Sequence, residues 1–406
     1  MPNFPITRAA ARALLAALFV AACVAGTASA SSIEEDDEDV SGADRAFAPP
    51  AALLDSSRRH AAETGFGWVG GVGAYAANDE NVFRSPRGRE QAAGAWGHTG
   101  YLRADTRWRR ANRVLATFTW TDTRFGRFPQ VDSSHPSLSV WYRRRLAPDL
   151  ALELDGDAVH QNDDATTING FDYTRDYSYW RYGGEAVLEW TPGARHRVRA
   201  GAEQVRKDYG EVAAFNSIDW TNWRTSASYR FRLARAQHVG AKFEYGERRY
   251  DEEPASIADG TELPGNPAEH HRYTDLVFWY DAPLGRRAAL DASLDLGRKT
   301  DLFQGYEDYR DRTVRVGLLA RPSAGIELRA GLVAGHRDYA RLAADAGETL
   351  AYDTIEARFG ARLRVLGTWW LYADLNRYER DTNRSTGLDY RDYRGVFSRA
   401  GVSVFR

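Results

Sequence analysis

The sequence predicts an all-β protein, a transmembrane antiparallel up-and-down β-barrel of about sixteen strands. Three observations predict this fold. Apolar side chains recur at alternate positions along most of the chain after Gly65, the connections between these stretches alternate between short and long, and Trp and Tyr gather near the ends of the stretches. A soluble sandwich gives no reason to sort its loops in this way, whereas outer-membrane barrels have short periplasmic turns and longer outer loops.

The composition is compatible with this fold class. The 406 residues carry a formal net charge of −2, which gives no reason to expect a nucleic-acid partner. Aromatic residues make up 12% of the chain, and many Trp and Tyr residues are typical of a barrel with aromatic girdles. The mean hydropathy of −0.55 does not argue against a membrane protein, because only every second residue of a barrel strand faces lipid.

Residues 1–30 have the form of a signal peptide. Two arginines precede an apolar stretch, and the sequence ASA at 28–30 is a cleavage site of the A-x-A type. The sequence VAAC at 20–23 also resembles a lipobox, so cleavage after Ala30 and acylation of Cys23 are alternatives. Both alternatives predict that the protein leaves the cytoplasm, and together with the strand pattern they predict the outer membrane of a Gram-negative-type cell.

Residues 31–64 are expected to form an acidic periplasmic arm. The stretch SSIEEDDEDVSGADRAF (31–47) is poor in apolar residues, which is typical of a disordered segment. The residues after it can form a short helix that begins at a proline. The predicted barrel then occupies residues 65–406.

The predicted strands follow one another without a helical stretch between them. The first is the glycine-rich GFGWVGGVGAYA, and the others contain the alternating apolar residues of 96–108, 114–120, 138–142, 150–154, 180–190, 198–202, 223–233, 239–245, 276–280, 290–296, 314–318, 326–332, 355–363, 369–375 and 396–404. The short connections are 109–112, 147–149, 191–195, 234–237, 283–287, 321–325 and 366–367. An even number of strands places both ends of the barrel on the periplasmic side.

Aromatic residues are expected to form two girdles at the level of the lipid headgroups. The outer girdle would contain Trp96, Trp120, Trp180 and Trp223, and the periplasmic girdle Trp108, Trp190, Phe231, Tyr280 and Trp369. In the same register Leu152 faces mid-bilayer and Glu153 faces the lumen. We therefore expect Leu152→Arg to impair assembly and Glu153→Arg to be tolerated.

Charged residues occupy the positions between the apolar ones and are expected to line the lumen. Two interpretations are open. The charges can form salt bridges that order a wet lumen, or clustered arginines can select anionic solutes, because guanidinium groups stay charged and bind carboxylates in a bidentate fork. The candidate lumen-lining residues are Arg143, Arg145, Arg224, Arg230, Arg232, Lys242, Glu244, Arg358 and Arg362.

The sequence contains no recognised catalytic or metal-binding motif. The histidines lack H-x-x-x-H and H-E-x-x-H spacing, and no G-x-S-x-G occurs. His98, near an outer loop, could lie beside a carboxylate as in barrel hydrolases, but we expect it to face lipid or a girdle. The loop that begins at Asp163 and Asp164 lacks the regular oxygen spacing of a calcium loop. We expect no enzymatic activity, no cofactor and no metal ion.

One short segment resembles a known family. The sequence ANDENVFRSP (77–86) follows the glycine-rich first strand and resembles the D-x-N-aliphatic-aromatic-Arg segment of the β-barrel porin type 2 family. The matching residues are Asp79, Asn81, Val82, Phe83 and Arg84. The resemblance implies an outer-membrane barrel of a kind often linked to exopolysaccharide export.

The predicted function is that of a porin-like channel in the outer membrane, passing polar or anionic solutes or an exported exopolysaccharide. Inward-facing aromatic residues favour the polysaccharide, because sugar rings stack on them; these are Tyr101, Trp141, Trp279, Trp370 and Tyr372. The alternative is a barrel enzyme, or a structural or assembly protein with a filled lumen. Expected partners are outer-membrane lipid, the barrel assembly machinery and, for export, a polysaccharide or periplasmic export proteins.

Overall fold

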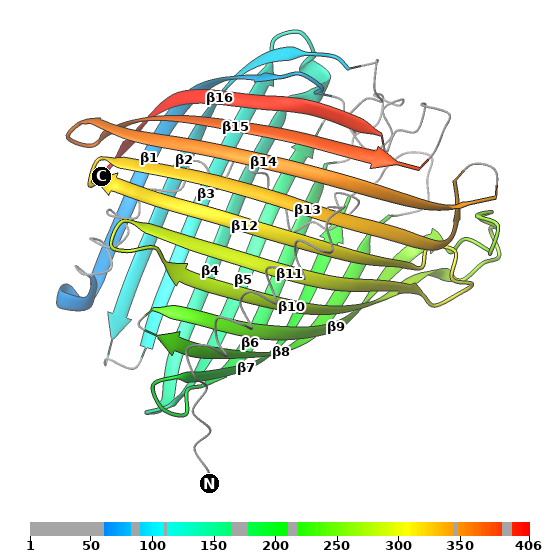
Figure 1. Cartoon of the computed structure of the whole chain (residues 1–406), viewed down its shortest axis with the longest axis horizontal. Coiled ribbons are helices and arrows are strands. Elements are labelled where there is room, and N and C mark those ends of the chain that lie inside the picture. The colour runs from blue at the N-terminus through cyan, green and yellow to red at the C-terminus, as the bar shows by residue number, and fades with distance from the viewer. Residues whose placement is uncertain are drawn as a thin grey trace.

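The computed structural model describes residues 61–82, 90–108, 112–163, 178–209, 218–234, 236–344, 347–383 and 392–406. These residues form sixteen antiparallel strands that follow chain order around one closed barrel, in which the first strand pairs with the last (Figure 1). The strands are β1 (Phe66–Asp79), β2 (Ala93–Trp108), β3 (Asn112–Phe125), β4 (Ser133–Ala147), β5 (Leu150–Asp163), β6 (Tyr179–Trp190), β7 (His196–Asp208), β8 (Trp220–Ala234), β9 (Gln237–Pro254), β10 (Ala268–Pro283), β11 (Ala288–Asp301), β12 (Tyr309–Ser323), β13 (Ile326–Ala343), β14 (Thr349–Leu366), β15 (Trp369–Thr382) and β16 (Tyr393–Phe405), with the short 3₁₀ helix η1 (Pro129–Val131) before β4. The predicted fold class is confirmed.

The connections are sorted by length as the sequence predicts. Short turns such as 148–149 and 324–325 lie at one end of the barrel, where the C-terminus also lies in Figure 1. Longer connections such as 255–267 lie at the opposite end. The short-turn end is therefore the periplasmic end and the long-loop end is the outer end.

Several strands extend further toward the outer end than the predicted stretches. Strand β9 continues to Pro254 and β13 to Ala343, well past their last alternating apolar residues. The hydrogen-bonded ladder needs only backbone groups, so it continues where the side chains on both faces become polar. The alternation of apolar residues therefore marks the lipid-covered part of a strand rather than its whole length.

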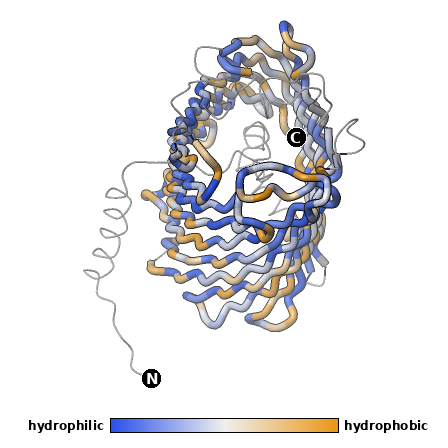
Figure 2. The backbone as a smooth tube through the Cα atoms, turned by 90° about the vertical axis from the view of Figure 1, so that its right-hand side faces the viewer, coloured by the Kyte–Doolittle hydropathy of each residue, from blue (hydrophilic) through white to orange (hydrophobic). Residues whose placement is uncertain are grey.

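Large apolar side chains are exposed on one face of the strands. Val72 is 65% exposed whereas Tyr75, on the other face of β1, is 6% exposed. Figure 2 shows the same alternation of hydrophobic and hydrophilic residues along many strands. So much exposed apolar surface requires lipid, and a closed barrel leaves no unpaired strand edge in it. The chain is therefore a β-barrel of the outer membrane.

The aromatic residues agree with this orientation. The tryptophans predicted for the outer girdle are exposed near the outer ends of their strands, and Trp190 and Trp369 are exposed near the short turns. Leu152 faces outward as predicted, but it lies opposite Arg144 in the β4–β5 register, close to the short-turn end. It is therefore near the membrane boundary rather than at mid-bilayer.

Only the end of the predicted periplasmic arm belongs to the described part of the chain. Residues 61–64 are helical, and the Gly65 amide donates to the Ala61 carbonyl oxygen at 3.0 Å. Gly65 has a φ of +86°, a conformation that suits glycine at a helix end. The signal peptide, Cys23 and the acidic stretch lie outside the described residues. Among the residues that are described, no helix is long and apolar enough to cross a membrane.

Candidate functional site

The nine candidate lumen-lining residues lie on the strand face opposite the exposed apolar residues. Near the short turns of β4–β7, two buried glutamates organise this inner wall. Glu153 binds Arg143 and, at 2.7 Å, Arg199, while Glu189 binds Arg143 at 2.7 Å and lies 3.3 Å from Arg197. Glu153→Arg would bring a fourth guanidinium group to this cluster and remove one of its two carboxylates. The structure therefore argues against the predicted tolerance of that substitution.

Several other candidates are also beside acids. Lys242 lies 2.7 Å from Glu244, and Arg358 donates to both oxygens of Glu356 at 2.6 Å. Arg362 lies 3.7 Å from Glu327, and Arg224 lies opposite Glu203 in the β7–β8 register. Most of the lining therefore follows the salt-bridge interpretation.

Three candidates behave differently. Within the described ranges of the chain, Arg145, Arg230 and Arg232 form no ion pair. Arg230 lies opposite Arg197 in the β7–β8 register, although like charges in that position repel. Arg232 lies opposite His238. The pair Arg230 and Arg232, called here the arginine strip, is therefore a positive feature of the inner wall that has no direct ion pair among the described residues.

Two acids lie beside the arginine strip. Asp281 on β10 is opposite His238 on β9, and Asp281 is also opposite Asp291 on β11. Among the residues described, Asp281 and Asp291 form no ion pair either. Cations on β8 and anions on β10 and β11 thus lie near one another without direct contact. Charged groups without an ionic partner need water, so this part of the inner wall is hydrated.

The family-like segment has a structural role at the barrel seam, where β1 pairs with β16 and closes the barrel. The Asp79 carboxylate accepts the Asn81 amide at 2.9 Å, which is an Asx turn, and it also accepts the Tyr378 hydroxyl at 2.9 Å. The Asn81 side chain donates to the Arg394 carbonyl oxygen on β16. Val82 is buried in an apolar cluster with Ala93 and Val131. The segment therefore fixes the turn after β1 to β15 and β16; Phe83 and Arg84 lie outside the described residues.

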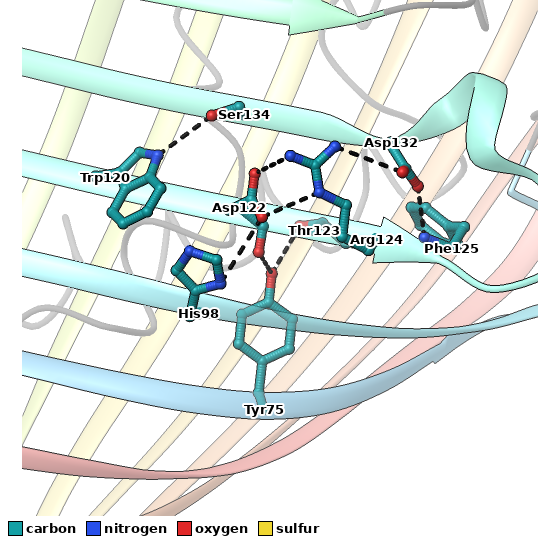
Figure 3. Close-up of polar contacts among 9 residues, drawn as sticks. All are labelled: Tyr75, His98, Trp120, Asp122, Thr123, Arg124, Phe125, Asp132 and Ser134. Carbon is teal, nitrogen blue, oxygen red and sulfur yellow. Dashed lines mark hydrogen bonds and ion pairs between the residues drawn. The ribbon is translucent and has the colours of Figure 1, made fainter.

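His98 lies on the outward face, as expected, in contact with girdle tryptophans. Its ring centroid is 4.5 Å from that of Trp120, and its Nδ1 is 3.7 Å from the Asp122 carboxylate. Figure 3 shows Asp122 between His98 and Arg124, and Arg124 binds it at 2.8 Å. Ser134 is opposite Asp122, and its hydroxyl accepts the Trp120 indole N–H. A hydrolytic triad needs histidine between serine and acid, whereas here the acid is in the middle.

One group of side chains has the donor atoms for a metal ion. His271 Nε2 lies 3.0 Å from a Glu269 oxygen and 3.3 Å from a Glu307 oxygen. Glu307, however, also binds the buried ammonium group of Lys299. A metal ion at this place would meet that positive charge, so the cluster is better explained as an ionic network. The loop that contains Asp164 lies outside the described residues.

A feature that the sequence analysis did not identify occupies the inner wall toward the outer ends of β7–β15 and continues at mid-strand on β16. Buried cations there lie over aromatic rings, and we call this set the cation–aromatic belt. Its stacked pairs are Lys207 over Tyr179 (3.9 Å), Arg248 over Trp220 (4.1 Å), Lys299 over Tyr309 (5.8 Å), Arg337 over Tyr309 (3.7 Å), Arg380 over Tyr352 (4.8 Å) and Arg399 over Tyr75 (5.2 Å). A sequence signal exists, because Arg337-x-Tyr339 and Tyr378-x-Arg380 place both side chains on one strand face.

No family model matches the chain, and no curated protein matches its sequence. Solved structures that it resembles include CdiB from Acinetobacter baumannii (8% identity, TM-score 0.47), where 83% of this chain and 60% of the CdiB chain are covered. The chain thus spans 60% of the length of CdiB. Others are OprB of Pseudomonas putida (10%, 0.46, covering 87% and 97%) and OmpT of Vibrio cholerae without loop L8 (10%, 0.45, covering 84% and 99%). At these scores the likenesses say nothing of substrate or mechanism.

Proposed function

We propose that this barrel is a porin-like channel for polar and anionic solutes and that the arginine strip contributes to its selectivity. The observation that carries the proposal is the set of charges without ionic partners on the inner wall. Arg230 and Arg232 on one side and Asp281 and Asp291 on the other need water around them. A wet lumen lined by separated charges of both signs can pass polar solutes, and the cationic side attracts anions.

The test is conductance in planar bilayers. Refolded wild-type protein should conduct, and Arg230→Glu with Arg232→Glu should shift the reversal potential toward cations. The shift should be largest at low salt, because the field of an exposed charge decays over about 8 Å at physiological ionic strength and over a longer distance at lower salt. A folded protein that does not conduct would contradict the channel proposal.

Two matched controls separate charge from shape. Arg230→Lys with Arg232→Lys keeps both charges and should leave the reversal potential unchanged. Asp281→Asn with Asp291→Asn removes the neighbouring negative charges and should shift the reversal potential toward anions. If the glutamate variant conducts with unchanged selectivity, the arginine strip does not act on passing ions.

Passage of an exopolysaccharide is a narrower version of this proposal. It is supported by the resemblance of residues 77–86 and by the half-buried Trp141 and Trp279 on the inner wall. Three other inward aromatic residues offer little surface to a sugar, since Tyr101, Trp370 and Tyr372 are each less than a tenth exposed. In the same bilayers, anionic oligosaccharides should block the current if the barrel carries such a polymer, and a salt current that these oligosaccharides leave unchanged would favour a general porin.

A further inference from the structure

The outward face of β10–β12 changes from apolar to cationic near the outer end. On β11, Leu296 is 36% exposed and the next outward residue is Arg298. On the outward face of β12, Arg312 comes two residues before Val314, and Arg310 comes two residues before Arg312. The arginines therefore begin where the lipid-covered apolar surface ends, on the side of the long loops.

Nearby arginines on this outer rim have acidic partners. Arg272 lies 3.4 Å from Glu247, and Arg312 lies 3.2 Å from Asp338. Arg298 and Arg310 are different. Both are exposed, and neither forms an ion pair or hydrogen bond with any residue that the structure describes, although the loops on both sides of β11 are fully described.

The two arginines are also directly opposite each other in the β11–β12 register. Side chains in that relation have Cβ atoms about 5 Å apart, and like charges there destabilise the sheet. Arg272 lies opposite Thr300, two residues beyond Arg298, and Arg312 lies two residues from Arg310 on the same strand face. The guanidinium groups of Arg272 and Arg312 are directed to Glu247 on β9 and to Asp338 on β13, so these two arginines border the central pair without joining it. An anion between Arg298 and Arg310 would reduce the repulsion within that pair.

We propose that Arg298 and Arg310, flanked by Arg272 and Arg312, bind the phosphate groups of phosphorylated lipids in the outer leaflet. Arginine forms bidentate hydrogen bonds with phosphate, and its charge does not depend on pH in the accessible range. The site borders the exposed apolar surface on the same face, so a lipid can place its acyl chains on Leu296 and Val314 and its headgroup on the arginines. This assignment is independent of whether the lumen conducts.

The experiment is a lipid titration of the full-length protein in detergent, followed by native mass spectrometry. The probes are a diphosphorylated outer-leaflet glycolipid and the same glycolipid after removal of its phosphates. Wild-type protein should bind the phosphorylated form at least about tenfold more tightly, and Arg298→Gln with Arg310→Gln should abolish that preference. Arg298→Lys with Arg310→Lys should retain part of it, because charge remains but the bidentate geometry is lost.

The matched control is Arg377→Gln with Arg394→Gln, which removes two outward arginines that lie 3.4 Å from Glu379 and from Glu90. This control should keep the preference within about twofold, because those charges are already compensated. Equal binding of both lipids by the wild type overturns the proposal without any variant. An equal loss in the control overturns the specific site, and full competition by millimolar inorganic phosphate would identify a general anion site instead of a lipid site.

Discussion

Arginines of the inner wall occupy different environments at the two ends of the barrel. Near the short turns Arg232 is exposed to the lumen, and Arg143 binds two carboxylates. Near the long loops Arg337 and Arg380 are 1% and 3% exposed and lie over tyrosine rings. The same residue type therefore supplies charge to the lumen at one end and packing to the wall at the other. The burial of a guanidinium group beneath other side chains, rather than the number of arginines, decides how strongly its electric field acts in the lumen.

The cation–aromatic belt also connects strands through shared rings. The Tyr309 ring lies beneath both Lys299 and Arg337, and the Tyr352 ring lies near both Arg337 and Arg380. Each ring thus joins cations from different strands. Because aromatic faces are electron-rich and the long Arg stem packs against apolar surface, such contacts add to the ion pairs of the wall, such as Lys299 with Glu307 and Arg399 with Asp374.

The largest expected effect of a single substitution is at the belt. Arg337→Ala should lower the free energy of unfolding by about 3 to 5 kcal/mol, because it empties a buried site between rings and removes its cation–π contacts. Arg232→Ala at the exposed end should change it by less than about 0.5 kcal/mol. Urea unfolding followed by heat-modifiable gel migration measures both. Similar losses in the two variants would show that the two ends do not differ as described.

A second prediction concerns the membrane boundary, which separates the lipid-covered part of the barrel from its two ends. Leu332 is exposed on the outward face of β13, where Ala330 and Ala334 lie before and after it, and it is opposite Val316. Leu332→Arg should cost about 2 to 4 kcal/mol, whereas Leu152→Arg, opposite Arg144, should cost at most about 1 kcal/mol, because the penalty falls toward the interface. Folded yield in lipid vesicles compares them. A larger loss for Leu152→Arg would contradict the assigned membrane boundary.

The smallest expected effect tests the seam next to the belt. Tyr378→Phe removes a buried hydroxyl that contacts the Asp79 carboxylate and the Asn81 carbonyl oxygen, and it should cost about 1 to 2 kcal/mol. The control Tyr182→Phe changes an outward ring that is 47% exposed and should be nearly neutral. Thermal unfolding of the refolded barrels resolves the difference. A neutral Tyr378→Phe would mean that the family-like turn is held by its backbone alone.

The sequence predicts which residues face the lumen, but it does not predict which residues they contact there. The alternation around Arg230 places that residue on the strand face that points away from lipid, since the period of two follows from strand geometry alone. The same alternation assigned Glu153 to the lumen as a tolerant position, although it is buried between an arginine of β4 and an arginine of β7. Cross-strand partners depend on register, which a single strand does not contain.

The sequence by itself determined the barrel, its strand number, its orientation and its outward face. These follow from local rules, namely side-chain alternation and the lengths of successive turns. Only the tertiary structure decided which charges are available. Arg298 and Arg310 are separated along the chain by β11's end and a loop, yet the register places them opposite each other on the lipid side. Arg337 and Arg232 carry the same charge, but a ring from another strand covers Arg337 whereas Arg232 is exposed. This difference depends on the closed barrel, because the burial of a side chain is set by neighbouring strands and not by its own strand alone.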